Sequence, residues 1–384
     1  MSRLPSNSYG LICNQQVLYF PEMKKIIPLI ALLVFGLCTQ VLSQNRKYGM
    51  NTSKKQSSYR GGKVGHAGIG IKRYSTVGFS LNAMNYFGDI TPTPSRFSTD
   101  VAFTKPGIGL TYSKVFHPQA AWRFGLNYGT ISGDDFNADN SAPPSQYLYL
   151  RNLHFKNTIL ELSWGIEFNL IPNNGGANNR FPLNPYLFLG IAVFKHNPQA
   201  IAPEFDLSGN RLPEAGQWVD LQPLGTEGQN TASGKPYSLI QLAIPVGLGV
   251  KVRLPNNFDA HFEIGFRQLF TDYLDDVGGP YPNLSLLDSD LARAMSERSG
   301  ETTAALAKQE RSYNDAPVTS NNWGFATADG STVSYRVGGN YGYDNIEAQG
   351  GVRGSAGQKD LYVITQLRLV YIFGVVSRKK AKFR

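Results

Sequence analysis

The chain has 384 residues and a formal net charge of +9, and only 17% of its residues are charged, against about 25% in a typical soluble domain. Its 40 glycines and its 12% aromatic content exclude a disordered chain, which has few aromatic residues, and a helical bundle, which carries less glycine. The longest apolar run covers residues 26–38, and a membrane helix needs about 20 residues. A multispan helical membrane protein is therefore excluded, whereas a transmembrane β-barrel remains open because its strands alternate polar and apolar residues.

The N-terminal residues predict an export signal. Lys24 and Lys25 precede the apolar run 26–38, and small or modest residues follow just before Gln44. This is the order of the charged, apolar and cleavage-site regions of a secretory signal. We therefore expect residues 1–43 to comprise an upstream extension and a cleaved signal peptide.

Cysteine usage narrows the chemistry further. Cys13 and Cys38 both lie upstream of Gln44, so the mature chain contains no cysteine. Disulfides, thiolate metal sites and cysteine nucleophiles are excluded together. Lipidation of Cys38 is not expected, because Leu37 stands where a lipoprotein signal has a small residue. The start of translation stays open between Met1 and Met23.

Basic side chains without acidic neighbours are concentrated at the two ends of the mature chain. They are Arg46, Lys47, Lys54, Lys55, Arg60, Lys63, Lys72 and Arg73 near the start, and Arg378, Lys379, Lys380, Lys382 and Arg384 at the end. We expect a basic N-terminal segment over 44–74, a barrel over 75–374 and a basic tail over 375–384. Such charge attracts acidic proteins or anionic lipid head groups. The alternative is a pair of disordered, solvated tails. Nucleic acid is not an expected partner outside the cytoplasm.

The strongest periodicity in the chain is two, the period of a β-strand. In residues 159–170, for example, Leu160 and Leu162 alternate with Glu161 and Ser163. Eight segments of this kind are present, at 76–87, 107–116, 121–130, 159–170, 185–194, 239–254, 259–269 and 361–373. Each has about the 9–11 residues that a tilted strand needs to cross a bilayer. Alternation alone fits either an all-β transmembrane barrel or a soluble sandwich, and the facing of 185–194 stays open because it is apolar on both faces.

The connections between these segments favour the barrel. In chain order they are 88–106, 117–120, 130–158, 171–184, 195–238, 255–258 and 270–360, so long and short connections alternate. Outer-membrane barrels have short periplasmic turns and long external loops. We therefore predict a closed antiparallel transmembrane β-barrel of about eight strands in the cell outer membrane, with both termini in the periplasm.

The connection 270–360 is too long for an ordinary loop and predicts a small external cap. It contains a helical-looking piece at 286–309. The tract 333–343 could instead add a hairpin to the barrel, which would then have ten strands.

An ordered set of short segments runs through the chain. They are NYFGD at 85–89, GTISGDD at 129–135, RNLHF at 151–155, PY at 185–186, FTDYLDDV at 270–277 and the closing run from RG at 353–354 to YIF at 371–373. Together they resemble the PorG-type outer-membrane β-barrel proteins of the type IX secretion system of Bacteroidetes, over roughly residues 75–375.

The resemblance implies a non-enzymatic outer-membrane subunit of this secretion system, which anchors or associates with the periplasmic ring complex. Expected partners are outer-membrane lipid, ring lipoproteins and other type IX components, with no small-molecule substrate. The chain departs from the family pattern in its longer basic segment 44–74 and in its tail beyond Phe373. Two alternatives are a structural barrel without a secretion role and a barrel enzyme built around the acidic external loop.

The sequence lacks several familiar enzymatic motifs. The five histidines, at His66, His117, His154, His196 and His261, are scattered over different predicted elements. No H-E-x-x-H pattern occurs, so no zinc site is predicted. The glycine-rich stretch 61–70 superficially resembles a phosphate loop but lacks the Gly-Lys-Ser/Thr that binds phosphate, and no G-x-S-x-G elbow is present. We predict no catalytic residue, no cofactor and no metal site.

Asp272, Asp275 and Asp276 form the one carboxylate cluster with a recognisable shape. One hypothesis is an external calcium site, since hard cations bind several oxygens. Another is a barrel protease that uses paired acids. The preferred interpretation is a solvated loop start in which aspartates cap or turn the backbone, because the spacing lacks the EF-hand order.

A last set of charges falls on the polar faces of the predicted strands. The set consists of Glu161, Glu167, Lys251, His261, Glu263, Arg267 and Arg368. In a closed barrel these side chains would point into the lumen. An eight-stranded barrel has an interior that side chains fill, so we predict a salt-bridged plug, with a water channel as the alternative.

Overall fold

The computed structural model describes residues 73–92, 103–138, 145–173, 176–232, 234–311, 322–326, 332–336, 353–354 and 359–373. The predicted signal peptide, nearly all of the basic segment 44–74, the tail 375–384 and His66 lie outside these residues. In the described part of the chain, no helix is both long and apolar enough to cross a membrane.

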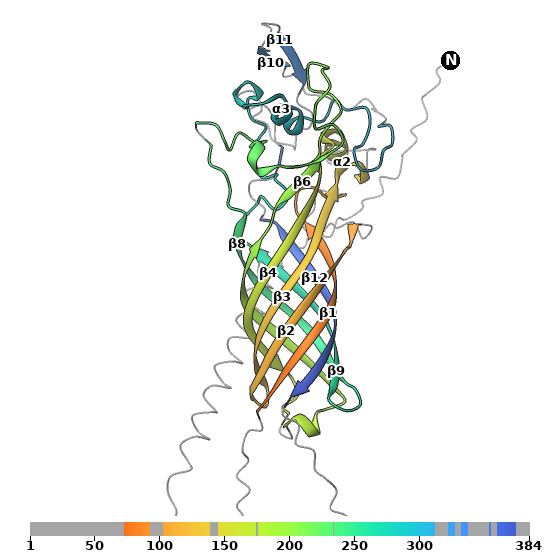
Figure 1. Cartoon of the computed structure of the whole chain (residues 1–384), viewed down its shortest axis with the longest axis vertical. Coiled ribbons are helices and arrows are strands. Elements are labelled where there is room, and N and C mark those ends of the chain that lie inside the picture. Colours follow the sequence, from red (N-terminus) through yellow and green to blue (C-terminus); the bar gives the residue numbers. More distant parts are fainter. Residues whose placement is uncertain are drawn as a thin grey trace, which may run out of the picture.

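Eight long antiparallel strands form the body of the protein (Figure 1). They are β1 (Tyr74–Phe87), β2 (Lys105–His117), β3 (Ala120–Asp134), β4 (His154–Asn169), β5 (Leu183–Lys195), β8 (Ile240–Arg253), β9 (Phe258–Leu269) and β12 (Leu361–Phe373). The order is β3-β2-β1-β12-β9-β8-β5-β4, and β3 pairs with β4, which closes the sheet on itself. Each predicted strand corresponds to one of these eight, so the predicted fold class is confirmed.

The strands place apolar side chains on the outer surface and polar side chains in the interior, which is the reverse of a soluble protein. On β4, Leu162 is 62% exposed whereas its neighbour Glu161 is completely buried in the lumen. The same alternation places Phe79, Leu110 and Leu367 on the outer surface. A barrel with an apolar outer surface and a polar interior is the architecture of a transmembrane β-barrel. The soluble sandwich is excluded because the apolar face points outward.

Aromatic side chains gather on the outer surface near the end where the connections are short. Trp122 stacks on Phe116 at 5.1 Å and on Trp164 at 5.6 Å between ring centroids. On the other side of the barrel, Tyr371 contacts Phe258 and Phe373 at 5.2 and 4.9 Å. Such girdles mark a membrane interface in barrels of this class.

The two ends of the barrel differ sharply (Figure 1). At one end β2 joins β3 through residues 118–119, and β8 joins β9 through 254–257, while the connection 170–182 holds a short 3-10 helix, η3 (Gly176–Asn179). β1 begins and β12 ends at this short-turn end. We call the opposite end, which carries the long connections, the mouth.

Two connections at the mouth contain more strand than the sequence predicts. β3 and β4 stay paired up to Asp134 and His154, so the predicted loop 130–158 shrinks to 135–153, with η2 (Asp135–Asn137) and α2 (Ser145–Arg151) inside it. The predicted loop 195–238 contains β6 (Pro198–Ile201), β7 (Trp218–Asp220) and η4 (Gln222–Leu224). β6 pairs with β4 and with β7, so this part of the wall continues beyond the barrel.

The cap predicted over 270–360 differs in detail. The helix expected over 286–309 is wrong in length: η5 (Leu284–Leu286) and α3 (Asp290–Ser296) are the helical pieces there. Ser289 caps the start of α3, where its side chain accepts a hydrogen bond from the Ala292 N–H. The helix ends at Glu297, whose backbone is extended. β10 (Asn322–Ala326) and β11 (Thr332–Arg336) form a separate two-stranded sheet, so the ten-stranded barrel is wrong.

Candidate functional site

The lumen is crossed by a first group of ion pairs centred on Glu263 of β9. Its carboxylate accepts hydrogen bonds from Arg123 of β3 at 2.6 and 2.8 Å, and from Arg368 of β12 at 2.8 Å. The Tyr186 hydroxyl of β5 donates to it at 2.7 Å. These groups are buried and come from four strands, so this group ties opposite walls of the barrel together.

A second group surrounds Glu161 of β4, nearer the mouth. Arg267 of β9 donates to it at 3.1 Å, Tyr362 of β12 at 2.6 Å and Asn127 of β3 at 2.9 Å. On the other side of Glu263, towards the short turns, Lys251 pairs with Glu167. Carboxylates and cations are therefore matched throughout the length of the lumen.

All the charged residues that the alternation assigned to the lumen are buried there or pair across it, and the salt-bridged plug is confirmed. His261 lies between Lys251 and Arg368 in the strand register, and neither of its ring nitrogens has a hydrogen-bond partner among the described residues. Sequence analysis missed Arg123 as a member of the plug. The signal was available, because Arg123 shares the polar face of its segment with Asn127.

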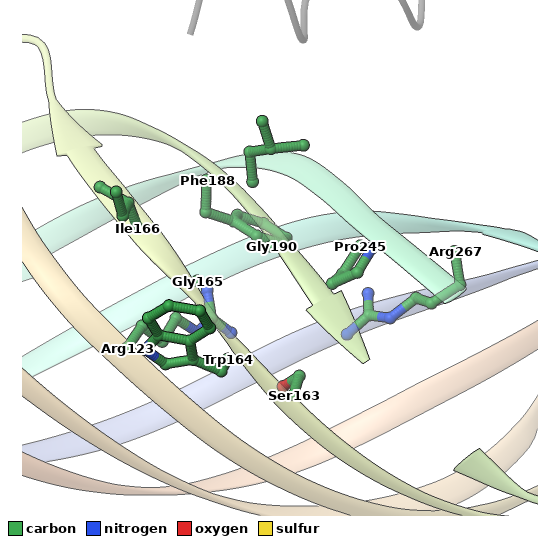
Figure 2. Close-up of a pocket in the computed structure, with 10 residues that line it drawn as sticks. Arg123, Ser163, Trp164, Gly165, Ile166, Phe188, Gly190, Pro245 and Arg267 are labelled. Atoms are coloured by element: carbon green, nitrogen blue, oxygen red, sulfur yellow. The ribbon is translucent and has the colours of Figure 1, made fainter. Parts of the chain in front are cut away.

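A small notch lies in the wall where β4, β5 and β8 meet. Gly165 lies directly opposite Gly190, and the β5–β8 register breaks at Gly190 and Ile191, opposite Pro245, which has no N–H to donate. Figure 2 shows the small notch at this place, lined by Trp164 and Ile166 as well as by the lumenal Arg123 and Arg267. Its volume of about 10 Å³ is enough for one water molecule at most.

At the mouth, the two ends of the cap segment meet on a tyrosine of β1. The Tyr86 hydroxyl lies 2.6 Å from Asp275 Oδ2 and 3.1 Å from Asp360 Oδ1, and it accepts the Asp89 N–H at 2.9 Å. Asp360 also accepts the Leu274 N–H at 2.8 Å. One hydroxyl hydrogen cannot serve two carboxylates, so this arrangement is satisfied when one of the two aspartates carries a proton.

Asp276 faces a different set of partners. Its carboxylate accepts hydrogen bonds from Thr226 and from the Tyr237 hydroxyl, the latter at 2.6 Å. Arg353 donates to the Asp276 carbonyl at 2.7 Å and pairs with Glu227 at 3.0 Å. The β5–β8 connection is thereby attached to both ends of the cap segment.

A third group joins the β3–β4 connection to the same place. Arg151 holds Asp135 in a bidentate pair at 2.7 and 2.8 Å. Its guanidinium also donates to the carbonyl of Arg353 at 2.5 Å and to that of Asp89 at 2.9 Å. Arginine matches a carboxylate in this fork geometry better than lysine can.

We call these residues the mouth cluster: Tyr86, Asp89, Asp135, Arg151, Asp275, Asp276, Arg353 and Asp360. All but Asp89 are buried. Burial raises the pKa of Asp275, and the nearby Asp89 raises it further. Burial and the Asp275 charge likewise raise the pKa of Asp360. For Asp276, burial raises the pKa to about 6 although Arg353 opposes the shift.

Asp272 is also held apart from the other two aspartates of the predicted cluster. It is buried, its carboxylate oxygens have no hydrogen-bond partner among the described residues, and Lys359 lies 3.8 Å away. Burial raises its pKa to about 7. The described residues contain no group of three or more His, Cys, Asp or Glu side chains that could hold a metal ion. The preferred interpretation of a solvated loop start is wrong about solvation, because the three side chains are buried. It is right that an aspartate turns the backbone here, since Asp275 accepts the Val277 N–H at 3.0 Å.

The mouth cluster contains residues from most of the short segments singled out in the sequence. Tyr86 and Asp89 come from 85–89, Asp135 from 129–135, Arg151 from 151–155, Asp275 and Asp276 from 270–277, and Arg353 from 353–354. Segments that are far apart in the chain therefore serve one purpose, which is to fasten the cap to the barrel.

Above the mouth lies a larger cavity of about 970 Å³, between residues 201–216 and 294–308. Phe205 is half exposed at its edge. Arg298 crosses from one side to the other, since it pairs with Glu301 at 2.6 Å and donates to the Ile201 carbonyl at 2.7 Å. The lining mixes acidic, basic and apolar groups.

Comparison with known sequences gives one family match. Residues 71–211 match the model of a family described as Domain of unknown function (DUF6089), which covers β1 through β6. No curated protein sequence matches the chain significantly.

Solved structures that align with this chain include outer-membrane proteins. The Neisserial surface protein A aligns with 7% identity and a TM-score of 0.30, over 77% of this chain and 96% of its own. Ail, the attachment invasion locus protein of Yersinia pestis, aligns with 7% identity and a TM-score of 0.32, over 79% and 99%. A major outer membrane protein of Thermus thermophilus aligns with 12% identity and a TM-score of 0.29, over 77% and 99%. The fold of this chain rests on its own strand order and register.

Proposed function

We propose that this protein is a non-enzymatic outer-membrane subunit of the type IX secretion system, in which the barrel anchors a periplasmic ring complex to the membrane. The observation that carries an anchoring role is the closed lumen. Glu263 and Glu161 join opposite walls through buried hydrogen bonds, and a lumen filled in this way suits a structural support better than a channel.

The secretion role is supported by the sequence segments that resemble the PorG-type proteins. In the fold, most of those segments contribute residues to the mouth cluster, which links the cap to the barrel. A cap held by these contacts offers a defined surface to cargo or to translocon components, and this suits a structural subunit better than an enzyme.

The orientation follows from the asymmetry of the barrel. With the short turns in the periplasm and the mouth outside, both barrel termini lie on the periplasmic side. The basic segment 44–74 and the tail 375–384, rich in Lys and Arg, would then extend towards the ring lipoproteins. Attraction between these ends and an acidic surface would weaken as salt is added.

The test is a mild-detergent purification of the tagged protein from outer membranes, with co-purifying proteins identified by mass spectrometry. Recovery of periplasmic ring lipoproteins at low salt, reduced after neutralisation of the 375–384 lysines and arginines to glutamine, is the expected result. A control neutralises Arg211, an exposed cation in the β5–β8 connection at the opposite end of the barrel. Recovery of the barrel alone, together with normal export of type IX cargo after gene deletion, would leave a structural barrel without a secretion role.

The enzymatic alternative has its own test. Asp272→Asn removes a buried cap carboxylate whose two oxygens both lack hydrogen-bond partners among the described residues. The anchoring role predicts unchanged cargo export by this variant when it is folded. Loss of a hydrolytic activity with retained folding would favour a barrel enzyme instead.

A further inference from the structure

The outer face of the barrel carries few charges, and their placement is uneven. By the alternation of the eight barrel strands, the charged side chains that share the face of the apolar belt without being buried are Lys114, Lys156 and Lys195. All three are cations. Lys114 lies near the short-turn end of β2, whereas Lys156 and Lys195 lie at the mouth end of the neighbouring strands β4 and β5.

Lys156 is held in a defined position at the upper edge of the belt. Its Nζ lies 4.0 Å from the centre of the Trp218 ring, on β7. Opposite Lys156 in the register is Gln199, whose amide donates to Asp220 at 2.6 Å. Asp220 also accepts from Asn197 at 2.8 Å, so amides rather than a lysine occupy this nearby carboxylate.

Lys195 lies where the apolar surface ends. Its register partners are Leu160 on β4 and Ile240 on β8, which are 45% and 61% exposed. The ion pairs of the described residues include neither Lys195 nor Lys156. A lysine next to lipid-exposed leucine and isoleucine extends its amine towards the head-group layer.

The two amines are suitably spaced for a large head group. Leu160, opposite Lys195, lies four residues along β4 from Lys156. At about 3.3 Å per residue and about 4.8 Å between strands, the two Cα atoms are about 14 Å apart. Long flexible side chains can bring their amines together or spread them over a head group that carries more than one phosphate.

We propose that the rim formed by Lys156, Lys195 and Trp218 binds the phosphorylated head group of an outer-leaflet glycolipid. The lysines neutralise phosphate groups, Trp218 lies at the interface between head groups and acyl chains as aromatic residues do in membrane proteins, and the acyl chains cover Leu160 and Ile240. This inference rests on the proposed outer-membrane location and on the orientation with the mouth outside.

The experiment measures binding of diphosphoryl lipid A to the full-length purified barrel by native mass spectrometry, with zwitterionic phosphatidylethanolamine as the comparison lipid. The test variant is Lys156→Gln with Lys195→Gln. The matched control is Lys114→Gln, a lysine on the same outer face at the opposite end. Each lysine near a membrane surface is worth about a five-fold change in affinity, so the double variant should bind diphosphoryl lipid A about 25-fold more weakly.

The control should bind like the unaltered protein, and phosphatidylethanolamine binding should not differ among the three. Equal loss in the control and in the double variant, or no loss in either, would overturn the rim site. Heat-dependent mobility on a gel checks that each variant is folded. Cell fractionation distinguishes the two proposals. Recovery of the unaltered protein outside the outer membrane would contradict the proposed location. Recovery in the outer membrane without binding of lipid A would contradict only the rim site.

Discussion

The lumen and the mouth cluster both bury charged groups, but they balance them differently. In the lumen, Glu263 has two arginines and Glu161 has one. At the mouth, Asp275 and Asp360 share the hydroxyl of Tyr86 and pair with no cation among the described residues. Burial of a carboxylate without a cation raises its pKa, whereas a close guanidinium opposes the shift. The lumen is thus a permanent plug, and the attachment of the cap depends on protons.

The largest expected effect is in the lumen. Glu263→Ala leaves Arg123 and Arg368 buried without their carboxylate, and breaking a buried pair costs about 3–5 kcal/mol. The temperature at which the barrel changes mobility on a gel should fall clearly. The double change of Glu263→Gln with Arg123→Gln should recover part of the loss, because it removes one of the two unpaired arginines and leaves only Arg368 without a carboxylate. An unchanged transition in Glu263→Ala would show that the plug does not stabilise the barrel.

The next largest effect is expected at the mouth, and it is compared with an exposed ion pair in the β5–β8 connection. Arg151→Ala leaves Asp135 buried without its partner and removes bonds to two loop carbonyls, so the cap should detach at a cost of about 3 kcal/mol. Hydrogen exchange of residues 271–278 should accelerate while the barrel strands stay protected. Arg211→Ala is the control, since its pair with Glu204 at 3.8 Å is exposed and contributes at most about 1 kcal/mol.

A smaller effect is expected in the wall where Gly165 lies opposite Gly190. A Cβ at Gly165 would lie 2.7 Å from the Gly190 Cα, and overpacking of this kind costs about 1–3 kcal/mol. Gly165→Ala should therefore lower the thermal transition of the barrel. Gly300→Ala in the cap, where a Cβ would meet no atom within 4 Å, should leave it unchanged. Equal transition temperatures in both variants would mean that β4 and β5 can move apart to accommodate the methyl group without loss of stability.

The smallest effect is the pH dependence of the mouth. The pKa of Asp272 is raised by burial to about 7 and that of Asp276 to about 6, from an ordinary value of 3.8. A raised pKa in the folded state means that the neutral carboxyl stabilises cap attachment, fully at acid pH and less as pH rises through the folded pKa. Cap attachment should weaken as the pH rises from the ordinary value of 3.8 to about 7.

Exchange of the Leu274 and Val277 amides, which donate to Asp360 and Asp275, is the measurement. Asp272→Asn should slow their exchange at pH 8, and the difference should shrink as the pH falls towards the ordinary value of 3.8. Faster exchange in this variant at pH 8 would mean that the Asp272 charge is needed by Lys359 and that the sign of the effect is reversed.

Sequence alternation located the eight strands and the residues of the plug, because the side-chain period of two depends only on the local backbone. It missed the extension of β3 and β4 beyond the belt, since Ile131 and Phe155 are buried there by the cap. It also misjudged 286–309, where helix-forming residues give way to turns after Ser296. The helix propensity of the residues predicts that a helix forms, but it does not predict the residue at which tertiary contacts end that helix.

The sequence by itself determined the class of the protein: its strands, their two faces and the alternation of long and short connections. The tertiary structure alone decided what the acidic residues do. Asp275 and Asp276 are adjacent in the chain, yet one turns to Tyr86 and the other to Thr226 and Tyr237. The partners of a buried carboxylate come from distant segments, so only the closed barrel, which brings those segments to one mouth, specifies them.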